Sequence, residues 1–155
     1  MDKDDIISTL NDLIQTCKDG AEGFRDCAAH VNEAQVKSLL DNRAQSCDSS
    51  AAELQELVRG YGGDPETKSS LAGTLHRRWV DIKAAISGRD EHAVLSECER
   101  GEDVAVRRYR DALDKVLPPE IRAVVERQYQ GALRNHDQVK ALRDRTQASR
   151  NLGKP

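Results

Sequence analysis

Four cysteines, four histidines and several glutamates are the residues of this sequence that could bind a metal or carry redox chemistry. Cys17 and Cys47 are the pair that a helical hairpin would bring to one level. If the chain folds back near residue 33, facing positions sum to about 65, so Cys17 lies opposite residue 48. Two thiolates with the carboxylate of Glu102 would suit a soft metal such as zinc, and His136 is a further candidate ligand.

The cysteines also have a simpler interpretation as structural residues. Their spacings of 10, 20 and 51 residues include no Cys-x-x-Cys motif, which is typical of zinc and thiol redox sites. Cys98 lies roughly 10 Å from one end of its expected helix, whereas Cys17 and Cys47 lie about 20 Å from an end. Unpaired cysteines commonly fill protein interiors as small apolar side chains. We therefore favour buried structural thiols over a metal or redox site.

Carboxylates are the second set of candidate ligands. A di-iron centre in a four-helix bundle uses a Glu-x-x-His pair on each of two helices and one glutamate from each of the others. The residues three positions before the histidines are Cys27, Gly73, Arg89 and Leu133, so no Glu-x-x-His pair is present. An all-carboxylate site made of Glu22, Glu53 and Glu102 stays open as a variant. Its alternative is that these glutamates are surface residues, as most glutamates are.

A basic stretch that holds the single tryptophan is the candidate partner-binding surface. Its members are Arg77, Arg78, Trp79 and Lys83. Tryptophan and arginine are enriched at the centres of protein interfaces. A tryptophan that anchors its own helix to the bundle, with solvated arginines beside it, explains the same residues without a partner.

Glycines inside expected helices form a further feature: Gly20, Gly23, Gly101 and Gly131. Each costs about 1 kcal/mol relative to alanine in a helix interior. Gly20 and Gly101 lie near apolar stripes, where a missing side chain would either widen a cavity or admit a neighbour such as Phe24 or Tyr109. Close packing of protein interiors favours the second use.

Apolar residues at steps of three and four predict that these candidates stand on helices. The first stripe covers residues 10–31 and the second residues 36–58. We expect Asp2 to cap the first helix, a capping box at 32–35 to begin the second, and Gly62-Gly63 to end it.

Three more helices follow, and no strand pattern appears. They are expected at about 66–87, from Asp90 to about 116, and after Pro118-Pro119. Four of the five helices are about 25–30 residues or roughly 40 Å long, and the third is shorter. The expected fold is all-α: a four-helix bundle over residues 1–150 with a helical crossover between helices two and four, which is ferritin-like connectivity. A disordered tail is expected at 151–155.

Four segments of the sequence resemble a known family: CKDGAEGF (17–24), SLAGTLHRRWVDIKAAISGRDEH (70–92), ECERGEDVAVRRYRDAL (97–113) and LPPEIRAVVERQYQ (117–130). They are similar to a bacterial family of ferritin-like four-helix-bundle proteins known as a domain of unknown function. The resemblance covers roughly residues 4–147. It implies the fold and a bacterial, cytoplasmic setting, and it implies no activity or cofactor.

Composition excludes several classes of function. Lys plus Arg number 24 and Asp plus Glu 27, and a net charge of −3 argues against a nucleic-acid binder. Aromatic residues make up only 3%, which leaves little on which bases could stack. No run near 18 apolar residues occurs, so no membrane span is expected. The acidic start, without a signal-peptide core, predicts a cytoplasmic protein.

These features favour a bundle that is not an enzyme and needs no cofactor. We expect it to act by self-association or by binding a protein partner in stress physiology, as a homodimer or another homo-oligomer. The alternative is a metal-binding or thiol-redox bundle, with iron, manganese or zinc as its metal. A third hypothesis is a small ligand in a cavity between the helices.

Overall fold

The computed structural model describes residues 1–68 and 91–152, with side chains up to residue 146. Within these ranges the regular structure is four helices and no strand: α1 (Lys3–Ala29), α2 (Ala34–Gly60), α4 (Glu91–Leu113) and α5 (Pro119–Leu152). The predicted all-helical fold is confirmed. α5 continues past the expected domain end at residue 150, and residues 153–155 lie outside the described ranges.

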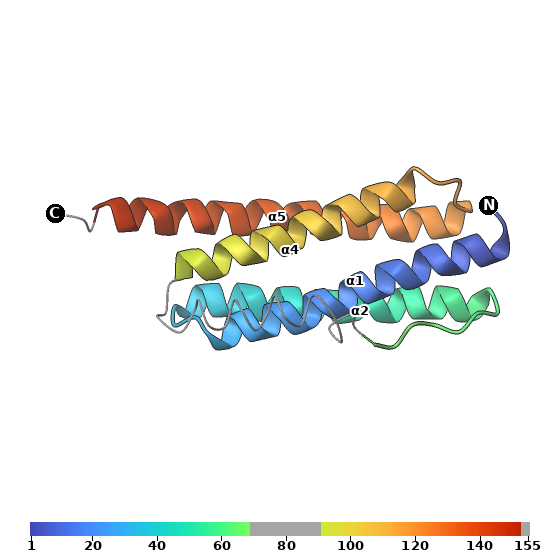
Figure 1. Ribbon diagram of the computed structural model, residues 1–155, viewed down its shortest axis with the longest axis horizontal. Coiled ribbons are helices and arrows are strands. Elements are labelled where there is room, and N and C mark those ends of the chain that lie inside the picture. The colour runs from blue at the N-terminus through green and yellow to red at the C-terminus, as the bar shows by residue number, and fades with distance from the viewer. Residues whose placement is uncertain (69–90, 153–155) are drawn as a thin grey trace.

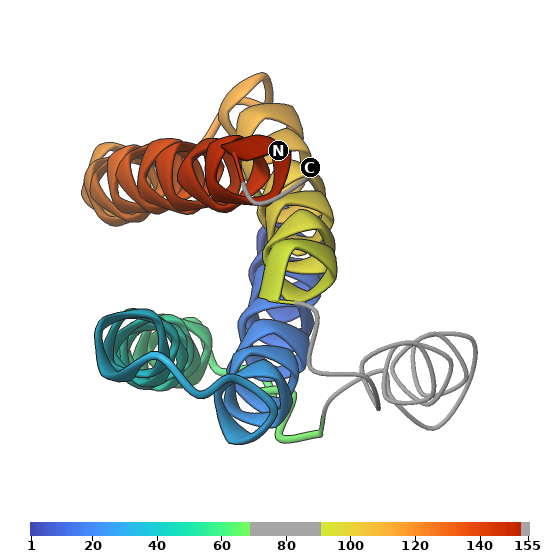
Figure 2. The ribbon, with the colours of Figure 1, turned by 90° about the vertical axis from the view of Figure 1, so that its left-hand side faces the viewer.

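The four helices form two antiparallel hairpins that pack on each other (Figure 1). α1 pairs with α2, and α4 pairs with α5. Seen along the bundle, α1 lies against α4, with α2 beside α1 and α5 beside α4 (Figure 2). α1 and α4 make the main contact between the hairpins, and α2 touches α5 more sparsely. This arrangement is a four-helix bundle.

The predicted crossover helix falls mostly on residues 69–90, which lie outside the described ranges, so the count of five helices and the crossover gain no support. Its expected start at residue 66 is wrong, because residues 66–68 are not helical. Asn11 of α1 explains this: its side chain accepts from the Glu66 N–H at 2.8 Å and donates to the Asp64 carbonyl at 3.1 Å. The chain is thereby held against α1. α4 begins at the end of the bundle opposite to that where α2 ends (Figure 1).

Helix ends test the predicted caps. The carboxylate of Asp2 accepts from the Asp5 N–H at 2.8 Å, so this cap is confirmed. The capping box at 32–35 is wrong: Glu33 is the N-cap of α2 and makes no side-chain cap. Glu91 Oε1, at the start of α4, instead accepts from the N–H groups of Asn32 and Glu33, both at 2.9 Å. A carboxylate from the other hairpin therefore satisfies these donors.

The predicted stop of α2 at Gly62-Gly63 is confirmed. Gly62 has φ 77°, the left-handed conformation that glycine adopts without strain. The Gly63 N–H donates to the Val58 carbonyl and the Gly62 N–H to the Arg59 carbonyl, which is the Schellman pattern. Gly63 also lies against α1, since a Cβ there would come within 2.8 Å of Ile7. Glycine at this position thus ends α2 and lets the turn approach α1.

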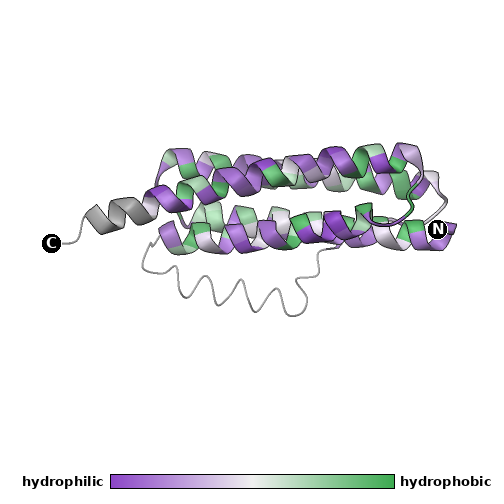
Figure 3. Cartoon of the chain, turned by 90° about the horizontal axis from the view of Figure 1, so that it is seen from above, coloured by the Kyte–Doolittle hydropathy of each residue, from purple (hydrophilic) through white to green (hydrophobic). Residues whose placement is uncertain are grey.

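Apolar and polar residues alternate along the helices (Figure 3), and most of the buried residues are apolar. They form two clusters, one toward each end of the bundle. The first apolar cluster surrounds the end with the α1–α2 turn and includes Phe24, Val36, Leu40, Leu95 and Val139. The second apolar cluster lies toward the opposite end and includes Leu10, Ile14, Leu54, Ile121 and Val125. The polar side chains that are described next lie where the two clusters meet.

Candidate functional site

A buried ion pair crosses the interior from α2 to α4. Arg43 donates from Nε to Glu102 Oε1 and from Nη2 to Glu102 Oε2, the latter at 3.1 Å. The Glu102 side chain is fully buried and the Arg43 side chain is only 10% exposed. The guanidinium also lies over the Phe24 ring, 5.7 Å from its centroid. Burial by itself would lower the pKa of Arg43, but the neighbouring Cys47 and the hydrogen-bonded carboxylate of Glu102 outweigh this and raise that pKa.

A chain of hydrogen bonds runs from Cys17 through Tyr109 to Gln128. Cys17 Sγ lies 3.2 Å from Tyr109 Oη, and Tyr109 donates to Gln128 Oε1 at 2.8 Å. Gln128 Nε2 donates to Glu53 Oε1 at 2.8 Å and to the Ser50 carbonyl at 3.3 Å.

The partners of Gln128 fix the direction of this chain. A carboxylate and a carbonyl only accept, so the amide nitrogen faces them and the amide oxygen faces Tyr109. Tyr109 therefore donates its one proton to Gln128. With that proton engaged, the hydroxyl oxygen of Tyr109 is left to accept from the Cys17 S–H.

Burial keeps both central thiols protonated. It raises the pKa of Cys17 to about 11 and that of Cys47 to about 12. Nearby Arg43 lowers both values, but burial is the larger cause. Because the thiolate is the nucleophile and the metal ligand, these thiols are poorly reactive near neutral pH.

A cavity of about 70 Å³ opens beside these groups. Its walls come from all four helices, including Cys17 of α1, Cys47 of α2, Tyr109 of α4 and Gln128 of α5. Gly20, Gly101, Val104 and Ala105 also line it, and all four are partly exposed. The cavity therefore reaches solvent along the seam between α1 and α4.

The two glycines of the cavity wall have different surroundings. A Cβ on Gly20 would lie 3.1 Å from Cys47 Sγ and 3.6 Å from the Phe24 ring, so this glycine makes room for its neighbours. A Cβ on Gly101 would meet no atom of the described residues within 4 Å. Packing against the described part of the chain does not require glycine at 101, and its absent side chain leaves the cavity open. The sequence allowed two uses of these glycines, to admit a neighbouring side chain or to widen a cavity. The first occurs at Gly20 and the second at Gly101.

The predicted thiol register is confirmed, since Cys17 and Cys47 line the same cavity. Glu102 lies close enough to influence both thiols, and its carboxylate is engaged by Arg43. Cys98 lies at another level, where it hydrogen-bonds Cys27; this contact and burial raise the pKa of Cys98. All four cysteines are free and buried.

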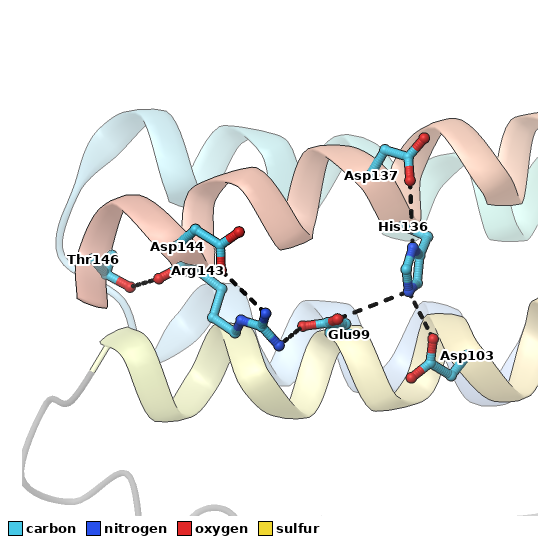
Figure 4. Close-up of polar contacts among 7 residues, drawn as sticks. All are labelled: Glu99, Asp103, His136, Asp137, Arg143, Asp144 and Thr146. Carbon is cyan, nitrogen blue, oxygen red and sulfur yellow. Dashed lines mark hydrogen bonds and ion pairs between the residues drawn. The ribbon is translucent and has the colours of Figure 1, made fainter. Parts of the chain in front are cut away.

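The other predicted ligands are not at the cavity. His136 Nε2 lies 2.7 Å from Asp103 Oδ1, in a network between α4 and α5 that also contains Glu99 and Arg143 (Figure 4). Glu53 is at the bundle edge, where it accepts from Gln128 and Arg127, and Glu22 is exposed. No group of three or more His, Cys, Asp or Glu side chains suited to a metal occurs within the described residues. Arg77, Arg78, Trp79 and Lys83 lie outside those residues.

Sequence reasoning missed Arg43 and did not single out the pairing of Tyr109 with Gln128. Gln128 and Glu102 each interrupt an apolar stripe, and a polar residue at such a position signals a buried polar contact. Arg43 gives no comparable signal in the sequence. It stands next to the stripe residue Ala44, a position that surface arginines also commonly occupy.

The family described as Domain of unknown function (DUF2383) matches residues 5–115. The chain belongs to this family. The DUF2383 match covers α1, α2 and α4, and with them the ion pair, both central thiols and Tyr109; Gln128 of α5 follows the matched region. The predicted membership in a family of unknown function is confirmed.

No curated protein matches the chain. None of the helices in the described ranges is long and apolar enough to cross a membrane.

Proposed function

We propose that this DUF2383 protein is a ferritin-like helical bundle that binds a small molecule in its interior cavity and does not catalyse a reaction. The observation that carries the proposal is the cavity among the four helices, which opens between α1 and α4, has a polar side and is held open by a glycine that packing against the described residues does not require. Small-molecule sites combine apolar walls with a few placed polar groups, and bundles build such sites between facing helices. The ferritin-like relation rests on the bundle and on the long link between α2 and α4.

The state of the polar groups supports binding rather than catalysis. A general acid or base works best when its pKa is near the operating pH and a proton can move. Glu102 is committed to Arg43, and Tyr109 to Gln128. The thiols of Cys17 and Cys47 have pKa values about 11 and 12, far from neutrality.

A binding screen with a matched pair of glycine variants tests the proposal. Thermal-shift screening of small fragments should give ligands that stabilise the full chain. Gly101→Val should abolish their effect by filling the cavity, whereas Gly131→Val on α5 should retain it, since a Cβ there meets only the end of Arg134 at 3.7 Å. Fragments that stabilise the wild type and Gly101→Val equally would reject the cavity as the site.

A metal-binding or thiol-redox function is the second candidate, favoured by the two thiols at one cavity. The cost of deprotonating them and the charge of Arg43 both oppose a cation. Elemental analysis of protein purified without chelators decides between the candidates. Stoichiometric iron, manganese or zinc that is lost in Cys17→Ser would favour the metal site, and metal-free protein that resists loading would reject it.

Assembly and setting complete the proposal. We place the protein in the bacterial cytoplasm, in stress physiology, as a homodimer or other homo-oligomer that uses its surface for self-association or for a protein partner. Light scattering on the full chain should give a mass of at least twice the 17.2 kDa of one chain. A monomer across micromolar concentrations would reject self-association.

A further inference from the structure

The Arg43 guanidinium, which lines the cavity, has donors that none of the described residues engages. A guanidinium carries five N–H groups, which form two forks for paired acceptors. Glu102 occupies the fork made by Nε and one N–H of Nη2. No described residue accepts from Nη1 or from the second N–H of Nη2. The Arg43 side chain is nine-tenths buried and lines the cavity, so these donors need an acceptor that enters it.

The charges around the cavity disfavour a charged occupant. Glu102 already balances Arg43, and both central thiols are neutral. Asp19 and Glu97, which have polar contacts of their own, line the cavity and would repel a further anion. Arg43 and Arg108 would repel a cation. Transfer of an uncompensated charge to such a buried place is strongly unfavourable.

The remaining walls fix the shape of the occupant. Phe24, Val104 and Ala105 present apolar surface, and the glycines at 20 and 101 add backbone without side chains. A cavity of about 150 Å³ holds benzene, so one of about 70 Å³ has room for roughly three non-hydrogen atoms within its walls, with further room at its opening to solvent. One end of the occupant must accept hydrogen bonds and the other must be apolar.

We propose that the cavity binds a small uncharged molecule with a carbonyl-type oxygen, which accepts from the free fork of Arg43 while its apolar end packs against Phe24 and Ala105. This rests on the proposed function and names its ligand class. Tyr109 and Gln128 satisfy each other and leave Arg43 as the group that selects the ligand.

Three probes of nearly the same size and shape that differ in charge and in hydrogen-bonding groups test the ligand class: acetamide, acetate and acetamidinium. Each is titrated into the full ¹⁵N-labelled chain, and the amide signals of Gly20 and Gly101 are followed. Acetamide should bind at least about tenfold more tightly than either ion, because acetate brings an unbalanced charge and acetamidinium brings a charge without an acceptor for Arg43. Acetate or acetamidinium binding as tightly as acetamide would overturn the ligand class.

The role of Arg43 is tested with two variants. Arg43→Lys keeps the charge opposite Glu102 but lacks the second fork, so acetamide affinity should fall about tenfold. The double variant Arg43→Met/Glu102→Leu replaces the ion pair with apolar groups of similar volume, so the bundle should stay folded. This variant serves as the test if Arg43→Lys does not fold. It should lose the preference for acetamide. Unchanged acetamide affinity in either variant would overturn the assignment to Arg43.

Xenon separates failure of the ligand class from failure of the proposed function, because it enters cavities without hydrogen bonds. If xenon shifts the Gly20 and Gly101 signals but no probe does, the cavity is a binding site and the carbonyl ligand is wrong. If neither xenon nor any probe shifts them, both proposals are wrong.

Discussion

The two cysteine pairs of the bundle are equally buried but have different surroundings. Cys27 and Cys98 are 1% and 0% exposed, lie in the first apolar cluster and hydrogen-bond each other. Cys17 and Cys47 are 5% and 3% exposed and lie where the two clusters meet, beside an ion pair and a cavity.

This difference shows that a pair of buried thiols does not by itself mark the position of the candidate ligand site. Cysteine fills space in both places, as its small apolar side chain allows. What distinguishes the central level is the set of residues around the thiols: Arg43 with Glu102, the Tyr109–Gln128 bond and the two glycines. Substitutions there and at the outer level or surface should therefore have different effects.

The largest expected effect comes from breaking the central ion pair. Glu102→Leu leaves Arg43 buried without its counter-charge and should lower the free energy of unfolding by about 3–5 kcal/mol. Urea denaturation followed by circular dichroism measures it. Arg143→Ala, in the more exposed network with Glu99, is the control and should lose no more than about 1 kcal/mol. Equal losses at the two places would remove the contrast between them.

The next effect concerns the hydrogen-bond chain. Tyr109→Phe leaves the Cys17 thiol and the Gln128 amide oxygen without their partner and should cost about 1–3 kcal/mol of unfolding free energy. Tyr61→Phe is the matched control, because the Tyr61 hydroxyl donates to Glu120 at the exposed surface. It should change stability by less than about 0.5 kcal/mol. A smaller loss for Tyr109→Phe than for Tyr61→Phe would argue against a satisfied central chain.

At alkaline pH the free energy of unfolding should depend on the two central thiols, Cys17 and Cys47. Their folded pKa values, about 11 and 12, lie above the unfolded value of 9.0, so the neutral thiols stabilise the fold fully below pH 9. This stability falls as pH rises from 9 toward 11–12, by about 1 kcal/mol per thiol between pH 9 and 10. Urea denaturation at both pH values measures the loss. Cys17→Ala/Cys47→Ala should show a shallower decline, and an identical decline would disprove the assignment.

Short-range geometry made much of the fold predictable. The turn between Ala29 and Ala34 is too short for anything but a hairpin, so the register that faces Cys17 with Cys47 follows from counting. Asp2 and Gly62 act on their own helices, and their roles are local.

Contacts between distant segments were not predictable. Glu91 caps the turn before α2 from 58 residues away, and Arg43 meets Glu102 across 59 residues. Nothing near either residue encodes the partner, because the pairing depends on how two hairpins dock. The cavity is a consequence of the same docking, which is why the sequence left two uses of Gly101 open.

The most direct test compares stability and ligand binding in Gly101→Ala. A Cβ there meets no described atom within 4 Å, so the variant should gain about 1 kcal/mol of unfolding free energy from helix propensity. The same methyl group narrows the cavity and should weaken acetamide binding, whereas Gly131→Ala should leave binding unchanged. A variant that is more stable and binds more weakly is the expected result. A Gly101→Ala protein that binds acetamide as tightly as the wild type would contradict the cavity as the functional site.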